Sequence, residues 1–483
     1  MTNSRIKLSA ALAAFVLVLG GCGNSSDSST ASSSATVAPS ETSTGAAETS
    51  AQLDVTAVHT IAVTVDDSSL RQMLQTYVDT GEKEWIHGSV TIDGESFTDV
   101  GFKLKGNSSL RSISVDTPAQ DLPLRIRLDK YVDGQQFEGI SDFTVRSNTS
   151  ETSMNEAVAL DLLTDAGLAS TKAIATRFSV NGSDETLRLT VQNLDDTWVE
   201  DYFPEAGADS VLYKSESDGT WEWNGEDADY SLSFDIEAGA NNYEPLIALL
   251  DLINNGTAEE IAAQLPELVD IDSFATYLAF EDVINNFDDI DGPGNNSYLF
   301  WDSATNKFTV VAWDHNLAFG GAGGGMPGMR ADGDMPEMPE GGMPDFGDRP
   351  DFPEGEMPEF GDGTMPDFPE GELPEGFVPP EGFVPPEGGP GGDNPGRGNM
   401  GGPGMSRSNP LVTVFNANAD WSALYDAKLA ELQASLIDGS ALATSVETWT
   451  ATLESGASDL VSTDIITTEG EAIRTSEQGE SSQ

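Results

Sequence analysis

Apolar and polar residues alternate along much of the first half of the chain, and this two-residue period is typical of half-buried β-strands. Runs of this kind predict strands over residues 58–65, 97–105, 122–128, 140–147 and 210–214. The stretch 172–192 predicts two more strands joined at Asn181-Gly182, because this dipeptide favours a tight hairpin turn. The first half of the domain is therefore expected to be rich in sheet.

Apolar residues at helical spacing become more frequent in the second half. They predict helices over residues 69–78, 153–166, 243–254, 272–286, 419–437 and 441–453. Ser153 is expected to cap the second of these helices and Gly167 to end it. The pattern as a whole predicts an α+β fold with a sheet-rich first half and a helix-rich second half.

The chain begins with the pattern of a secretory signal. Arg5 and Lys7 precede an apolar run over residues 8–19, which is too short to span a bilayer stably. We therefore interpret residues 1–21 as a signal peptide. The letters LGGC that end at Cys22 resemble the bacterial lipobox, and this resemblance implies cleavage before Cys22 and acylation of its thiol.

Residues 22–52 consist mostly of Ser, Thr and Ala, which cannot bury a core, so we expect a flexible tether. The folded domain, residues 53–320, would then lie outside the cytoplasm, anchored to the membrane by lipid. Cys22 is the only cysteine of the chain, which excludes a structural disulfide and a cysteine-built metal site.

Two further segments follow the domain. Residues 321–408 contain nine of the twelve methionines among dense Pro, Gly and acidic residues, which predicts a long disordered insertion. Binding of Cu(I) by these methionines is a weaker alternative, because no His or Cys accompanies them. Residues 409–466 are expected to form C-terminal helices that complete the domain, and residues 467–483 a polar tail.

The chain is strongly acidic, with a formal net charge of -60 that becomes -62 when Arg5 and Lys7 leave with the signal peptide. Such a field repels nucleic acid and anionic lipid, so neither is expected as a partner. Divalent cations and basic protein segments fit the charge better.

Oxygen-bearing side chains gather around one predicted hairpin. SYLFWD and KFTVVAW flank SATN, and a turn between Ala304 and Thr305 sets residue 296 opposite residue 313. Asn296 and Asp314 then emerge at one end of the hairpin, where the loop containing Asp288 also enters. Oxygen ligands of this kind suit Mg²⁺, Mn²⁺ or Ca²⁺ rather than zinc.

The order of Asp288, Asn296, hairpin and Asp314 is also that of a protein-kinase site. The first interval is eight residues here and about five in ordinary kinases. The alternative interpretation is that the acidic residues solvate a turn and that Asp314 caps the next segment.

Several segments resemble the spore-coat protein H (CotH) kinase-like family. They include GFKLKGNSSLR at 101–111, the stretch 137–168, and the blocks NNSYLFWD and VVAWDHNLAFG. The resemblance implies an atypical protein-kinase-like fold that uses ATP with Mg²⁺ or Mn²⁺ to phosphorylate Ser or Thr of surface proteins. It implies that Asp288 is the catalytic-loop aspartate and that Asn296 and Asp314 bind metal.

The same resemblance places the KGNSS block, residues 105–109, near the nucleotide phosphates. The block itself favours anion binding, because a Gly-containing turn exposes N–H groups and hydroxyls. Its members are Lys105, Gly106, Asn107, Ser108 and Ser109.

Glu156 is either the glutamate that orients a phosphate-binding cation or a surface residue. The cation itself stays open among Lys105, Arg127 and Lys214. Members of the family often have Glu where Gln192 stands and Asp where Asn316 stands, so this chain has less negative charge there.

Three functions remain in competition. The first is an ATP-dependent kinase, and the second is a catalytically inactive binding or scaffold lipoprotein with the same fold. The third and weakest is Ca²⁺-dependent adhesion through DDIDGPGNN, which lacks the ligand pattern of an EF-hand.

Overall fold

The computed structural model of the chain describes residues 53–217, 219–292, 295–321 and 409–476. The predicted signal peptide, the tether with Cys22, and residues 322–408 of the predicted insertion lie outside these ranges. None of the helices within them combines the length and the apolar character needed to cross a bilayer.

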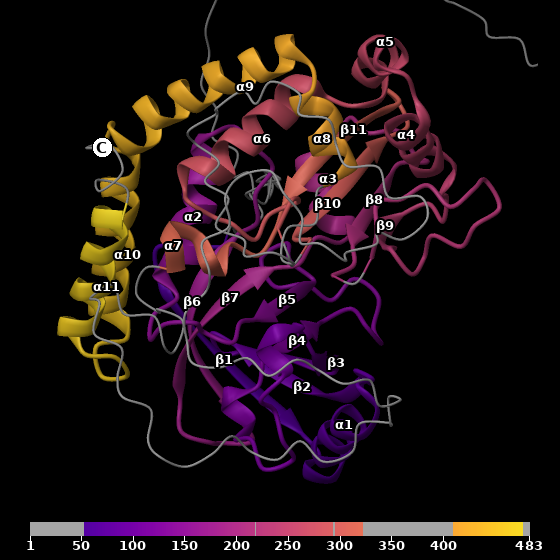
Figure 1. The fold of residues 1–483 in the computed structure, drawn as a ribbon. Helices are drawn as coiled ribbons and strands as arrows, with labels where there is room; N and C mark the ends of the chain where they lie inside the picture. The colour runs from indigo at the N-terminus through magenta and orange to yellow at the C-terminus, as the bar shows by residue number, and fades with distance from the viewer. Residues whose placement is uncertain (1–52, 218, 293–294, 322–408, 477–483) are drawn as a thin grey trace, which may run out of the picture. The chain divides into compact units, whose positions relative to one another are not determined.

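Seven strands close into a barrel in the order β1-β2-β3-β4-β5-β7-β6 (Figure 1). They are β1 (Val58–Val65), β2 (Ile86–Ile92), β3 (Glu95–Leu104), β4 (Leu124–Arg127), β5 (Asp142–Val145), β6 (Ala173–Val180) and β7 (Thr186–Gln192). β1 and β6 run parallel, and the other neighbours are antiparallel. Phe102, Ile126 and Phe178 are fully buried in the core of the barrel.

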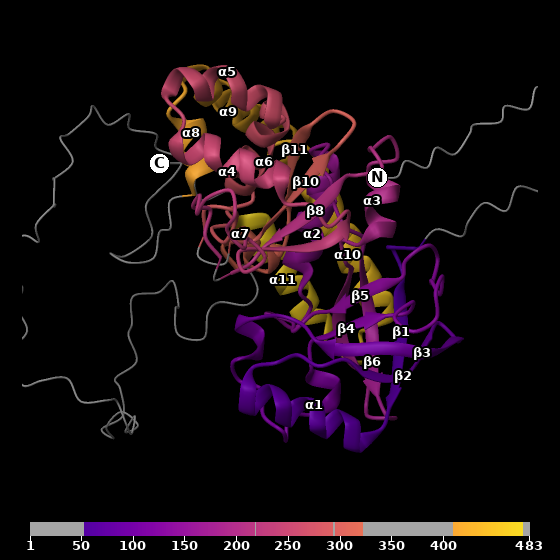
Figure 2. The same ribbon diagram turned by 90° about the vertical axis from the view of Figure 1, so that its right-hand side faces the viewer.

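The sequence pattern predicts β1 with its observed bounds, because inward and outward residues alternate along it without a break. It misses β2, in which Gly88 and Ser89 weaken the alternation and the pairing with β3 shifts register between them. α1 (Asp67–Thr80) packs against β2 (Figure 2).

The second sheet has the order β11-β10-β8-β9. Its strands are β8 (Val211–Ser215), β9 (Phe234–Gly239), β10 (Ser297–Asp302) and β11 (Lys307–Ala312). Ser297 pairs with Ala312, so residue 296 lies opposite residue 313, and the predicted hairpin register is confirmed. The helices around this sheet are α3 (Asp196–Tyr202), α4 (Glu244–Asn255), α5 (Ala258–Leu268), α6 (Ile271–Val283) and the short α7 (Ala318–Gly321).

α2 (Met154–Asp165) joins the barrel strands β5 and β6 along the chain and packs against α7 and against two later helices, α10 (Ala441–Gly456) and α11 (Thr463–Ser476). The predicted helix is confirmed, and Gly167, with φ of 75°, follows its last turn in the left-handed region. The predicted cap is wrong, because Ser153 itself has φ of 52° and its side chain makes no capping hydrogen bond. Nearly every residue from Met154 to Leu163 is buried, since α2 is covered on both sides.

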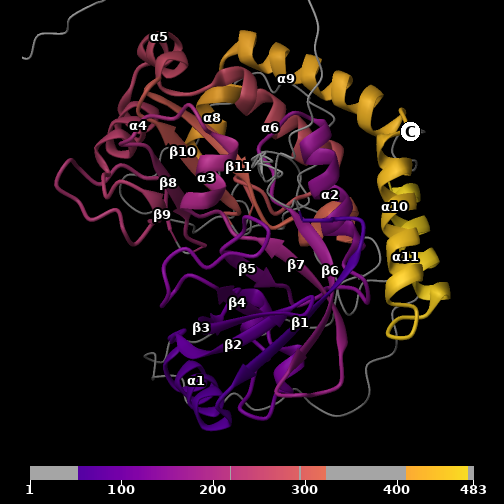
Figure 3. The ribbon, with the colours of Figure 1, turned by 180° about the vertical axis from the view of Figure 1, so that it is seen from behind.

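The described residues after 408 form four α-helices: α8 (Pro410–Asn416), α9 (Ala419–Leu432), α10 (Ala441–Gly456) and α11 (Thr463–Ser476). The prediction of a polar tail from residue 467 is wrong as far as Ser476, because α11 continues there and buries Glu469, Gly470 and Ile473. Residues 477–483 lie outside the described ranges. α10 and α11 pack side by side and cover α2 (Figure 3).

The contact between α2 and α10 predicts a pH-dependent stability. Asp161 accepts hydrogen bonds from Ser445 Oγ at 2.6 Å and Trp449 Nε1 at 2.9 Å. Burial raises the pKa of Asp161, although these two bonds oppose the shift. A carboxyl group with a raised folded-state pKa contributes stability that is present at low pH and is lost as the pH rises through that pKa.

Asp161→Asn keeps one acceptor oxygen and cannot ionise. The wild type therefore loses stability relative to the variant as the pH rises from about 4 to about 7. We expect the free energy of unfolding of the variant, minus that of the wild type, to increase over this range. Urea unfolding at several pH values measures this difference, with Glu454→Gln on the exposed face of α10 as the control. A difference that does not change with pH would contradict the prediction.

Candidate functional site

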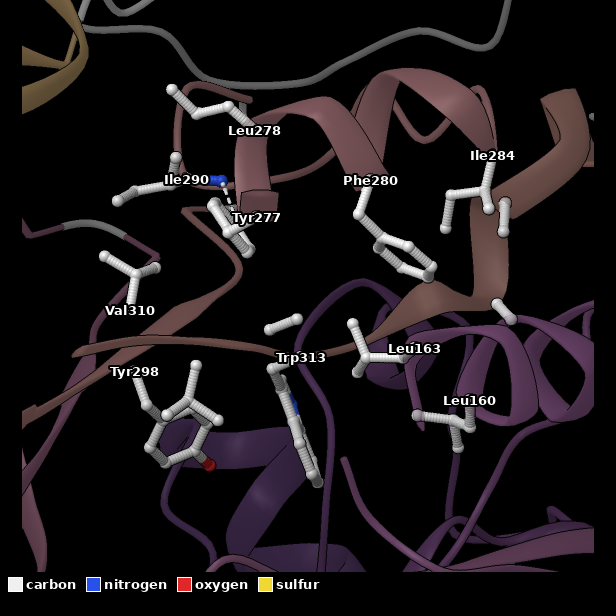
Figure 4. Close-up of a cluster of buried hydrophobic side chains, with 14 of the residues drawn as sticks. Leu160, Leu163, Tyr277, Leu278, Phe280, Ile284, Ile290, Tyr298, Val310 and Trp313 are labelled. Carbon is white, nitrogen blue, oxygen red and sulfur yellow. Dashed lines mark hydrogen bonds between the residues drawn. The ribbon is translucent and has the colours of Figure 1, made fainter. Parts of the chain in front are cut away.

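Trp313 is the residue around which the candidate site is built. It follows β11 and is 7% exposed. Lys105 Nζ lies 5.7 Å from its ring centroid and Arg146 Cζ lies 4.9 Å from it. Tyr298 of β10 contacts the same ring edge to face, at 5.5 Å between centroids (Figure 4). Lys105 follows β3 and Arg146 follows β5, so both strand ends meet at Trp313, the residue before Asp314.

Arg146 bridges two carboxylates. Its Nη2 contacts Glu156 of α2, and its Nη1 lies 3.2 Å from Asp314 Oδ1. Burial alone would lower the pKa of Arg146, but Asp314 and Glu156 outweigh that effect and raise it. The guanidinium therefore stays charged. Its Nε has no hydrogen-bond partner among the described residues.

Arg146 is a cation beside Glu156 and Asp314 that was not among the candidates drawn from the sequence. Among the three candidates, Arg127 pairs with Asp129 at 2.8 Å and Lys214 pairs with Glu216 at 2.6 Å. Lys105 alone lies against Trp313.

A usable signal for Arg146 was present. It directly follows the strand β5, and the chain then leads into the helix that carries Glu156, as the β3 lysine of protein kinases precedes its αC glutamate. The alternative of a surface position for Glu156 is wrong, since this side chain is 1% exposed.

The KGNSS block follows β3 directly and forms a turn at the start of the connection to β4. Gly106 has φ of 112°, and a Cβ added there would lie 2.1 Å from Ser109 Oγ, so the turn requires glycine. Lys83 Nζ donates to Gly106 O at 2.6 Å, and Asn107 Nδ2 donates to Ser217 Oγ at 2.6 Å. The second bond joins this barrel loop to the residues that follow β8.

Cations gather near this turn in a chain that has few of them. Burial lowers the pKa of Lys105 to about 7, and it also lowers the pKa of Lys83 and Lys103. Lys103 and Lys130 each have Nζ 4.8 Å from the ring centroid of Trp85. A bound anion would favour the charged form of these lysines, so the cluster suits an anionic ligand.

Asp288 and Asn296 are brought together by the loop that follows α6. Asn296 Nδ2 donates to Asp288 O at 3.0 Å, and Asn296 N donates to Asp289 O at 3.2 Å. Tyr277 of α6 accepts a hydrogen bond from Ile290 N at 3.1 Å, which fixes the middle of the loop (Figure 4). Asn296 also lies opposite Trp313 across the hairpin. The catalytic and metal-binding roles of Asp288, Asn296 and Asp314 stay predictions.

Glu281 of α6 is a buried carboxylate that no sequence motif marked. It accepts from Asn286 Nδ2 at 2.8 Å and lies 3.2 Å from His315 Nε2. Burial alone would lower the pKa of His315, but Glu281 outweighs it and raises the pKa. Glu281 therefore joins the residue after Asp314 to the start of the loop that contains Asp288.

The donors fit a metal that is bound together with a nucleotide. Within the described residues, no group of three or more His, Cys, Asp or Glu side chains is arranged to hold a metal ion. Asp314 and Asn296 would supply hard oxygen atoms to such a metal, since Mg²⁺ commonly binds through one or two protein ligands plus water and substrate phosphates.

These features define a kinase-like protein: a barrel with a glycine-containing turn and an Arg–Glu pair, followed by an Asp, an Asn and a second Asp around a hairpin. The family model described as CotH kinase protein matches residues 103–349, and the chain belongs to this family. No curated protein matches the chain. The match includes the candidate site and leaves out β1, β2 and helices α8 to α11.

Proposed function

We propose that this chain is an extracytoplasmic kinase, anchored to the membrane by lipid on Cys22, that phosphorylates Ser or Thr of surface proteins. It uses ATP with Mg²⁺ or Mn²⁺. The observation that carries the proposal is the charged Arg146 held between buried Glu156 and Asp314. In protein kinases, an ion pair between a strand lysine and a helix glutamate accompanies nucleotide binding, together with the metal-binding Asp.

Each part of the site has a separate task in this proposal. Arg146, Lys105 and the N–H groups of the KGNSS turn hold the nucleotide phosphates. Asp288 accepts the proton of the acceptor hydroxyl, while Asn296 and Asp314 supply oxygen ligands. The divalent metal, when bound with ATP, neutralises charge on the transferring phosphoryl group.

The net charge of the chain indicates what kind of protein segment would accept the phosphoryl group. A net charge of -60 attracts basic protein segments and disfavours nucleic acid. We therefore infer a protein acceptor whose Ser or Thr is flanked by Lys or Arg.

Incubation with labelled ATP and Mn²⁺ tests the function. We expect label on a basic Ser-containing peptide, loss of labelling with EDTA, and a higher unfolding temperature when ATP and Mn²⁺ are added together. Absence of both labelling and the nucleotide-induced thermal shift would contradict the proposal and favour the binding or scaffold function. Stabilisation by Ca²⁺ without nucleotide would instead favour adhesion.

A further inference from the structure

One carboxylate of the C-terminal helix α11 is buried in the loop that precedes α2. Glu469 is 6% exposed. Its oxygens accept from Ser150 Oγ at 2.8 Å, Glu151 N at 3.0 Å and Thr152 N at 3.1 Å, and also from Thr152 Oγ1. Ser153 gives α2 no capping bond of its own, and Met154 N at the start of the helix donates instead to Thr152 Oγ1 at 3.1 Å. Because the same hydroxyl donates to Glu469, the carboxylate also fixes the group that binds the first turn of α2.

This loop connects the two partners of the central ion pair. It begins after Arg146 at the end of β5 and leads into α2, which carries Glu156 in its first turn. A movement of this loop would therefore displace Arg146 at its start and Glu156 after its end.

The loop and α2 also contact the segment after Asp314. Thr149 Oγ1 donates to Asn316 O at 3.3 Å, and Asn155 Nδ2 donates to the same carbonyl at 2.7 Å. The junction that Glu469 holds is thus bonded directly to the chain two residues beyond Asp314.

The C-terminal helices α10 and α11 both pack against α2. A Cβ added to Gly470 of α11 would lie 3.1 Å from Thr450 Oγ1 of α10 and 3.6 Å from Met154 Sδ of α2. Glycine at position 470 lets α11 approach closely enough for the neighbouring Glu469 to enter the loop.

We propose that Glu469 is a positioning residue for the nucleotide site. It fixes the loop over residues 147–153 and so holds Arg146 and Glu156 in contact beside Asp314. The inference rests on the proposed function, and it gives a task to helices that lie outside the family match over residues 103–349.

The test compares three single variants of the full chain. Glu469→Gln keeps the size of the side chain but replaces one acceptor oxygen by a donor amide. Glu471→Gln is the matched control on the exposed side of α11, and Ile473→Val destabilises the buried side of α11 without touching the Glu469 bonds. We expect about tenfold weaker binding of ATP with Mn²⁺ for Glu469→Gln, seen as a higher KM for ATP. Both controls should stay within about twofold of the wild type.

A double-mutant cycle separates positioning from general stability. If Glu469 acts through Glu156, the Glu469→Gln change should have little further effect on ATP binding in the Glu156→Gln background. Equal ATP binding by Glu469→Gln and Glu471→Gln would overturn the inference. Fully additive losses in the double variant would overturn it as well.

Hydrogen exchange of residues 147–160 keeps this test distinct from that of the proposed function. We expect faster exchange there in Glu469→Gln than in either control, with or without nucleotide. A wild-type protein that binds no nucleotide would overturn the proposed function, and unchanged exchange in Glu469→Gln would overturn the positioning of α2 by Glu469.

Discussion

Asp314→Asn should abolish phosphotransfer, with a fall in kcat of at least about 10³-fold, and should leave the protein folded. The change removes the negative charge that would bind the metal of ATP. Asn accepts the left-handed backbone of this position, where φ is 67°, with little strain. Asp314 is also 30% exposed, so losing its ion pair with Arg146 should cost no more than about 1 kcal/mol of stability.

Labelled-ATP assays and thermal unfolding measure the two halves of this prediction. Asp272→Asn is the matched control, because it removes another exposed Asp ion pair, with Lys428 at 2.9 Å, from the start of α6. This control should keep its activity. Retention of more than about a tenth of the activity by Asp314→Asn would mean that Asp314 is not a metal ligand.

Local pattern was sufficient for much of the barrel and for the hairpin. β1 follows an unbroken alternation of buried and exposed residues, so its bounds could be derived from the sequence. The register of β10 and β11 followed from one four-residue turn, and it placed Asn296 next to Trp313 across the two strands.

Local pattern failed where burial depends on distant partners. The buried face of α11 includes Glu469. A sequence pattern assigns a glutamate to the exposed face of a helix unless its hydrogen-bond donors are known. Those donors, Ser150 to Thr152, are more than 300 positions away along the chain, since the bonded pairs are separated by 317 to 319 residues. No periodicity within α11 could reveal them.

The sequence order of strand, Arg146 and helix was visible, but the choice of Arg146 over the other cations needed partners that are distant along the chain. Arg127 and Lys214 were as plausible from composition, but each lies beside its own nearby acid, Asp129 and Glu216. Arg146 has no acidic residue within three positions, and Asp142, four positions before it, pairs with Arg125, so the partners of Arg146 had to come from α2 and from the end of the hairpin.

Arg146→Met should be the most destabilising of the single changes considered. It leaves Glu156 buried without its cation, and removing one partner of a buried ion pair costs about 3–5 kcal/mol of unfolding free energy. It should also abolish binding of ATP with Mn²⁺. Urea unfolding and the nucleotide-induced thermal shift measure these effects. Arg127→Met, whose partner Asp129 is partly exposed, is the control and should lose no more than about 1 kcal/mol.

The double variant Arg146→Met, Glu156→Met separates stability from function. Replacing a buried ion pair by apolar side chains of similar volume is often neutral, so the double variant should regain most of the stability and none of the nucleotide binding. Burial raises the pKa of Glu156, and the loss of Arg146 removes the main interaction that opposes this shift. A raised carboxyl pKa makes stability fall as the pH rises, so the deficit of Arg146→Met should shrink as the pH falls toward 4.5, the ordinary pKa of a glutamate. An equal deficit in the single and double variants, or ATP binding that survives in either, would show that the pair does not hold the nucleotide site together.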